Sequence, residues 1–107
     1  MTDRLEQLLK FHEADPDDTF CTYGIAMEHA NRGETDQALQ WLDKTLAIDA
    51  DYAYAWYQKA RLLHEAGRVD EALAATAEGE AAAGRSEDTH AAEELATLRE
   101  AIEADAT

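Results

Sequence analysis

This chain of 107 residues contains few cysteine, proline and basic residues. It has one cysteine, one proline and only nine lysine and arginine residues together. A lone Cys21 cannot form an internal disulfide, which fits a reducing compartment. β-Branched residues are sparse as well, so helix formers such as alanine, glutamate and leucine dominate. No stretch approaches the roughly 18 apolar residues of a membrane span, and residues 1–14 lack the apolar core of a secretory signal. We therefore expect an all-α, cytoplasmic protein.

Positive charge is the second shortage. The 24 acidic and nine basic side chains give a formal net charge of -15. Nucleic acids and anionic membrane surfaces bind dense basic patches, so this balance argues against both as partners. Repulsion at this charge density destabilises the compact state at low ionic strength, and salt relieves it. Two interpretations follow: a protein adapted to a salty cytoplasm, as in a halophile, or an ordinary acidic protein.

The sequence offers no catalytic or metal-binding constellation. The four histidines are isolated, without an HExxH or similar pairing: His12, His29, His64 and His90. Cys21 and His29 lie about 12 Å apart along a helix, too far for a nucleophile and its base. The acidic run at residues 15–18 lacks the alternating ligands and central glycine of a calcium loop. We therefore expect no enzyme activity, no metal and no cofactor.

Two blocks of the chain, residues 19–52 and 53–86, carry the same residues at the same places when offset by 34 positions. The matched pairs are Ala26 with Ala60, Gly33 with Gly67, Asp36 with Asp70, Ala38 with Ala72, and Leu39 with Leu73. A fixed period of this size indicates a solenoid, in which each unit buries its apolar face against a neighbour. Such an architecture favours binding over chemistry.

Apolar periodicity predicts six helices separated by short breaks. Their expected ranges are 3–14, 19–31, 35–48, 54–66, 69–83 and a last helix that begins near 86–88 and frays at 105–107. The breaks fall at Pro16 and at three glycines, Gly33, Gly67 and Gly84, because proline disfavours helix before it and glycine ends helices. In the last helix, Ala91, Leu95, Leu98 and Ile102 form one apolar stripe, and the opposite face is acidic.

With this period, two helices per period and a glycine break, the chain resembles the tetratricopeptide repeat family. Trp56, Ala60 and Leu63 match the aromatic, small and large positions of the family's first helix, and Asp15-Pro16 matches its repeat-ending dipeptide. The resemblance covers residues 5–86 and implies a right-handed superhelical stack of antiparallel helix pairs in one domain. The expected parts are an N-terminal helix and half repeat at 1–18, repeats at 19–52 and 53–86, and a capping helix at 87–107.

Several positions depart from the family pattern. Thr22 stands where the second repeat has Trp56, and Thr76 replaces a large apolar residue. Lys59 fills a position usually held by leucine, and it can bury its stem while its ammonium stays in water. Gly79 inside a helix costs roughly 1 kcal/mol relative to alanine. We interpret these departures as packing losses that leave the second repeat less tightly built.

The resemblance also implies a concave groove, lined by the first helix of each repeat, that receives a peptide. The groove residues would be Phe20, Tyr23, Gly24 and Met27 from one repeat, and Tyr54, Tyr57, Gln58 and Arg61 from the next. Tyrosine, methionine and arginine are favoured in binding surfaces. The alternative is that these side chains only cover neighbouring helices. The groove has no cluster of lysine, arginine and asparagine, so capture of a C-terminal carboxylate is not expected.

These observations predict a non-catalytic scaffold that binds an unidentified peptide or protein through the groove. Self-association is the alternative function. Leu5, Leu9 and Phe11 cannot all face inward from a terminal helix, which favours a weak homodimer through that helix.

Overall fold

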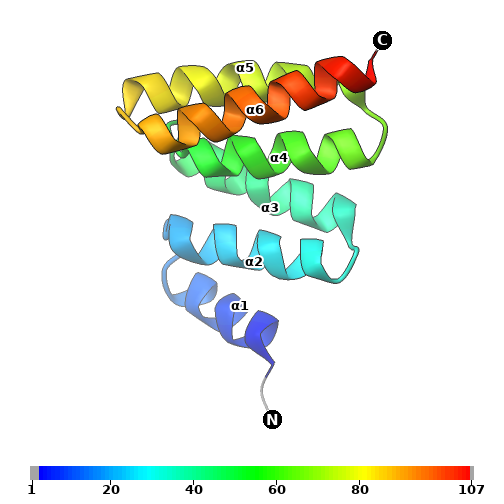
Figure 1. Cartoon of the computed structure of the whole chain (residues 1–107). Coiled ribbons are helices and arrows are strands. Elements are labelled where there is room, and N and C mark those ends of the chain that lie inside the picture. Colours follow the sequence, from blue (N-terminus) through cyan, green and yellow to red (C-terminus); the bar gives the residue numbers. More distant parts are fainter. Residues whose placement is uncertain (1–2, 107) are drawn as a thin grey trace. The chain divides into compact units, whose positions relative to one another are not determined.

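The computed structural model describes residues 3–106, which form six helices and no strand (Figure 1). Their bounds are α1 (Arg4–Ala14), α2 (Thr19–Asn31), α3 (Thr35–Ile48), α4 (Ala53–Glu65), α5 (Val69–Arg85) and α6 (Thr89–Asp105). The all-α prediction is confirmed, and the helices start within about three residues of the expected positions. Met1, Thr2 and Thr107 lie outside the described residues, as does the expected fraying of Thr107. Among the helices described, none combines the length and the apolar character needed to cross a bilayer.

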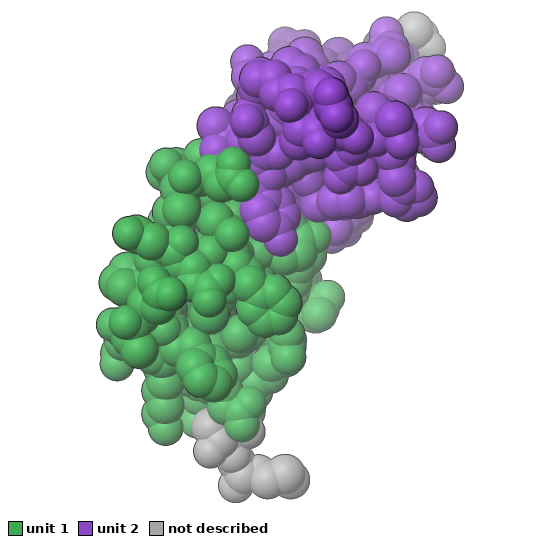
Figure 2. Space-filling view, turned by 90° about the vertical axis from the view of Figure 1, so that its left-hand side faces the viewer, with its two compact units in different colours: residues 1–49 green, residues 50–107 purple. Residues whose placement is uncertain are grey.

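The chain divides into two compact units, Met1–Asp49 and Ala50–Thr107, coloured separately in Figure 2. In the first unit, α2 packs against both α1 and α3. In the second unit, α4, α5 and α6 all contact one another. Each unit therefore contains one helix pair, α2 with α3 or α4 with α5, together with one flanking helix.

The helix ends explain why the breaks fall where they do. Asp3, Asp18 and Asp88 each cap the N-terminus of the following helix, with a side-chain oxygen accepting from a backbone N–H. Gly33 and Gly67 follow α2 and α4 with φ of 75° and 78°, in the left-handed region that glycine adopts at low cost. The glycine breaks expected at these two positions are confirmed.

One expectation about a helix end is wrong. Gly84 does not stop α5, which continues to Arg85, and the left-handed turn falls instead on Glu87 with φ of 57°. Asp105 is the last residue of α6, and its carboxylate lies 2.7 Å from His64 Nε2 of α4. The glycine signal at Gly84 missed the true end of α5 because the backbone turn is made three residues later.

A buried hydroxyl pair joins α2 to α3 in the first unit. Thr45 Oγ1 donates to Thr22 Oγ1 at 2.8 Å, and both side chains are fully buried. The fully buried Ile25 and Leu42 belong to the same two helices. Thr22 is thus accommodated by a hydrogen-bonded partner, so its departure from the aromatic pattern leaves no unsatisfied polar group.

The second unit is closely packed around Gly79 and Thr76, which corrects the expectation that the second repeat is less tightly built. A Cβ added at Gly79 of α5 would lie 2.8 Å from Trp56 Cβ of α4 and 2.7 Å from Leu95 Cδ2 of α6. Glycine is therefore the residue that lets three helices approach. Thr76 is fully buried, and its hydroxyl donates to the Leu73 carbonyl at 2.7 Å. Neither position is a packing loss.

Candidate functional site

The expected groove residues of the second repeat all lie half-buried on α4. The rings of Tyr54 and Tyr57 meet edge to face, with centroids 6.3 Å apart. Arg61 Nε donates to Gln58 Oε1 at 2.9 Å, and Arg61 Nη1 lies 3.0 Å from Glu65 Oε1. The guanidinium is therefore held along α4 by its own helix, beside the two tyrosines.

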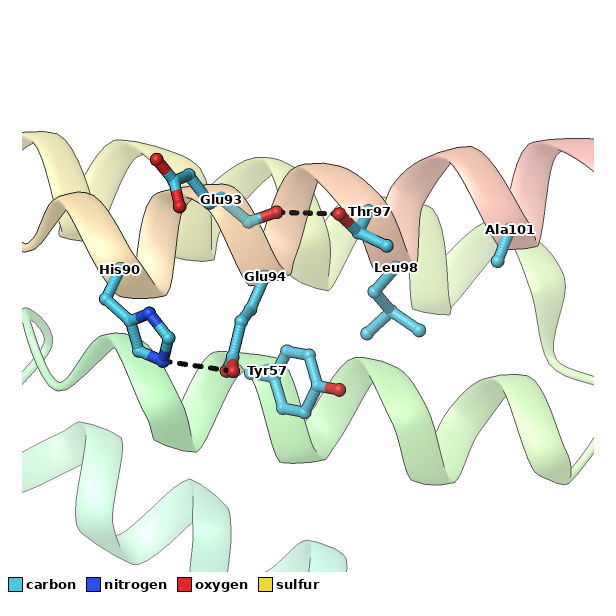
Figure 3. Close-up of a pocket in the computed structure, with 7 residues that line it drawn as sticks. All are labelled: Tyr57, His90, Glu93, Glu94, Thr97, Leu98 and Ala101. Carbon is cyan, nitrogen blue, oxygen red and sulfur yellow. Dashed lines mark hydrogen bonds and ion pairs between the residues drawn. The ribbon is translucent and has the colours of Figure 1, made fainter.

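A pocket of about 440 Å³ opens between α4 and α6 (Figure 3). Its lining residues are Tyr57, His90, Glu93, Glu94, Thr97, Leu98 and Ala101. Figure 3 shows that Tyr57 rises from α4 while Glu94 and Leu98 descend from α6 toward it. Of the residues expected to line a groove, only Tyr57 lines this pocket.

The chemistry of this pocket is mixed. Tyr57 and Leu98, both half-buried, supply apolar surface. Glu94 Oε1 lies 3.2 Å from His90 Nε2, and Glu93 stands exposed at the rim. Within residues 3–106, Glu93 has no ion partner. The pocket can therefore receive a side chain that combines an apolar stem with a polar or positive end.

Sequence reasoning missed the contribution of α6 because it treated this helix as a cap. The apolar stripe did place Leu98 on the inward side, and Leu98 is half-buried whereas Ala91, Leu95 and Ile102 are fully buried. The apolar pattern of α6 does not predict the distance between α4 and Leu98. That space depends on the packing of α4 and α6 together.

The expected groove residues of the first repeat lie on α2 and do not all share one environment. Phe20 is exposed, whereas Tyr23 and Met27 are half-buried. Gly24 faces α1, since a Cβ added there would lie 3.2 Å from Leu8 Cδ1. The expectation that Gly24 lines a groove is wrong: it is a contact point between α1 and α2.

A second pocket of about 370 Å³ lies between α1 and α2. Its lining residues are Arg4, Gln7, Leu8, Phe11, Ala14, Asp15, Asp18, Phe20 and Cys21. Phe11 and Phe20 remain 62% and 69% exposed at this pocket, the two most exposed of the large apolar side chains described. This aromatic patch belongs wholly to the first unit.

The titratable side chains are held in structural contacts. Burial, followed by the nearby Asp18 carboxylate, raises the pKa of the Cys21 thiol, which therefore stays protonated and poorly nucleophilic. His29 pairs with Glu34 at 3.1 Å, and His12 packs edge-on against Trp41. Across the described part of the chain, no cluster of three or more histidine, cysteine or acidic side chains could hold a metal ion.

The predicted groove residues fall in both compact units. Phe20, Tyr23 and Met27 belong to the first unit. The α4 residues belong to the second unit, together with the pocket against α6.

Comparison with known proteins matches a family model described as tetratricopeptide repeat over residues 29–102. An uncharacterized protein of Methanocaldococcus jannaschii is 34% identical over 50 residues, covering 47% of this chain and 58% of that protein. The chain thus spans little more than half the length of this relative.

Two solved structures resemble the fold over most of the chain. One is the solution structure of a tetratricopeptide repeat domain protein from Salinibacter ruber, with a TM-score of 0.79, 27% identity, and coverage of 84% of this chain and 91% of that one. The other is the type III secretion chaperone SycD of Yersinia enterocolitica in complex with a peptide of the translocator YopD. Its TM-score is 0.86 at 16% identity, covering 96% of this chain and 79% of that one, so it supports the fold alone. With its 34-residue period, its helix pairs and the family match over residues 29–102, the chain belongs to the tetratricopeptide repeat family.

Proposed function

We propose that this protein is a non-catalytic scaffold that binds segments of partner proteins. The observation that carries the proposal is the open pocket between α4 and α6, with Tyr57 and Leu98 on its walls, in a chain of the tetratricopeptide repeat family. A protein of similar fold, SycD, was solved with a peptide of YopD bound to it. The buried Cys21 thiol and the structural pairing of the histidines support a role without catalysis.

The α4 face has the composition of a binding surface. Tyr54 and Tyr57 present rings that are already fixed by their mutual packing, so binding costs little side-chain entropy. Arg61, held by Gln58 and Glu65, offers a positioned guanidinium. Phe20, Tyr23 and Met27 on α2 form a separate candidate face in the first unit.

A random peptide library displayed on phage, with inserts of about twelve residues, tests this proposal. We expect enriched peptides to bind Tyr57→Ala/Arg61→Ala at least about tenfold more weakly, because central aromatic and arginine side chains dominate binding energies. Arg68→Ala is the matched control, since it removes the same charge from an exposed pair with Glu71. Circular dichroism verifies that each variant is folded. Undiminished binding to the folded double variant would remove the α4 face from the proposal.

The aromatic patch of the first unit favours self-association as a second function. Phe11 and Phe20 project beside a recess in the same surface, so one patch carries both the knob and the hole that an isologous dimer requires. Light scattering at low and molar NaCl tests this, with Phe11→Ser/Phe20→Ser as the disrupted variant. A dimer predicts that wild type has a higher mass than this variant. A strictly monomeric mass for wild type at both salt concentrations excludes it.

The expected setting of this scaffold is the cytoplasm, with a protein rather than a nucleic acid or a membrane as partner. The lone buried thiol supports a reducing compartment. The net charge of -15 opposes binding to phosphate-rich surfaces.

A further inference from the structure

We propose that the pocket between α4 and α6 selects partner segments by a lysine or arginine side chain, an inference that rests on the proposed scaffold function. The stem of that side chain would lie against Tyr57 and Leu98, and its charged end would meet the carboxylate of Glu94, which reaches down beside Tyr57 (Figure 3). The exposed Glu93 would add negative charge at the rim of the pocket. The partner class is therefore a segment with a cationic residue beside apolar ones.

Two carboxylates of the pocket are available to a cation. Glu93 is exposed at the rim and has no ion partner in the described chain. Among the residues described, the carboxylate of Glu94 forms an ion pair with His90 alone, an exposed side chain on its own helix, at 3.2 Å. An incoming guanidinium or ammonium can therefore pair with Glu94 by displacing one exposed imidazole, and with Glu93 without breaking an ion pair.

The other walls suit the stem of a long cationic side chain. Tyr57 and Leu98 give half-buried apolar surface, against which the methylenes of lysine or arginine pack well. The Tyr54 ring adjoins both Tyr57 and His90, with centroids 6.3 Å and 6.4 Å away. Aromatic faces attract a cation within about 6 Å, so the Tyr57 ring on the pocket wall and the carboxylates act in the same direction.

The positive groups nearby are already engaged. Arg99 of α6 pairs with Glu80 at 2.7 Å and with Glu103 at 2.9 Å. Arg61 of α4 is bound to Gln58 and Glu65. Neither leaves a free cation at the pocket, and the overall charge of -15 steers positive segments toward the protein.

The same phage-displayed peptide library, counter-selected on Tyr57→Ala/Leu98→Ser, tests the inference. We expect the enriched peptides to contain lysine or arginine next to an apolar residue. One enriched peptide is then synthesised with its cationic residue kept or replaced by norleucine, which retains the stem and removes the charge. We expect the cationic form to bind wild type about fivefold to tenfold more tightly, the gain typical of a partly exposed charge pair assisted by an aromatic face.

Charge-neutral variants test whether the preference for the cationic peptide depends on the pocket carboxylates. Glu93→Gln/Glu94→Gln should bring the two peptides to nearly equal affinity. Glu6→Gln/Glu13→Gln is the matched control: it removes the same net charge from exposed positions on α1, and it should retain the preference. Titration at about 0.15 M NaCl measures each affinity.

The outcomes separate the inference from the function on which it rests. Enriched peptides without lysine or arginine overturn the inference, as does a preference that persists in Glu93→Gln/Glu94→Gln. Either result leaves peptide binding at the pocket in place. If counter-selection on the folded Tyr57→Ala/Leu98→Ser variant leaves no enriched peptide, peptide binding at this pocket fails, and the inference fails with it.

Discussion

At the scale of single residues, the two repeats fill the same contact between their paired helices with different side chains. Offset by 34 positions, Thr22 corresponds to Trp56 and Thr45 to Gly79. The first repeat pairs two medium side chains through a buried hydrogen bond of 2.8 Å. The second repeat places tryptophan, the largest side chain, opposite Gly79, which has no side chain. A Cβ added at Gly79 would lie 2.8 Å from Trp56 Cβ. In each repeat, the two helices therefore stay in close contact because the sizes of the two facing residues complement each other.

Gly79→Ala should lower the free energy of unfolding by up to about 2 kcal/mol. Overpacking of a filled core costs about 1 to 3 kcal/mol, because relief requires α4 to shift, and the helix-propensity gain offsets roughly 1 kcal/mol of that cost. Gly84→Ala is the control on the same helix, where an added Cβ meets nothing within 4 Å, and it should be neutral or stabilising. Urea denaturation measures both. Equal stabilisation by the two substitutions would contradict the close approach at Gly79.

At the scale of elements, α1 is attached to α2 by a few identifiable contacts. Leu8, the one buried residue of α1, packs into the space left by Gly24. Asp3 caps α1 and also pairs with Arg32, the residue that follows α2, at 3.0 Å. This ion pair holds the pKa of the Asp3 carboxyl below its usual range. A group whose pKa falls on folding stabilises the folded state above its unfolded pKa and loses that effect in acid.

The protection of α1 should therefore depend on Asp3 near neutral pH and much less in acid. Asp3→Asn retains a good cap and removes the charge, so it isolates the pairing with Arg32. We expect faster amide exchange in α1 of this variant near neutral pH. The difference from wild type should shrink as the pH falls from the ordinary aspartate value of about 4 through the lower pKa of the folded state, where the carboxylate of wild type becomes protonated. Hydrogen exchange followed by NMR measures it, and a difference independent of pH would contradict the role of the charge.

At the scale of the whole molecule, the acidic side chains far outnumber the basic side chains that could form ion pairs with them. The six arginines all take part in ion pairs, several of them exposed, which contribute little individually. With 24 acidic side chains against nine basic ones, many carboxylates remain without a cation. Their mutual repulsion is an energetic cost that screening reduces.

The urea midpoint of unfolding should therefore rise between about 0.05 M and 2 M NaCl. If the exposed ion pairs outweighed the repulsion, salt would instead lower the midpoint. Guanidinium chloride is unsuitable as the denaturant because it is itself a salt. A midpoint that barely moved would exclude salt adaptation as the reason for the acidic composition.

The family, the number of helices and the glycine turns at Gly33 and Gly67 could all be predicted from the amino-acid sequence. These features follow from periodicity and backbone preference, which depend on residues close together in the chain. Which residues share a surface became known from the packing of the helices. That packing places Gly24 and Gly79 at helix contacts, continues α5 past Gly84, and leaves a pocket between Tyr57 and the acidic face of α6. A cavity or a close approach depends on the distance between helices, which no single helix encodes.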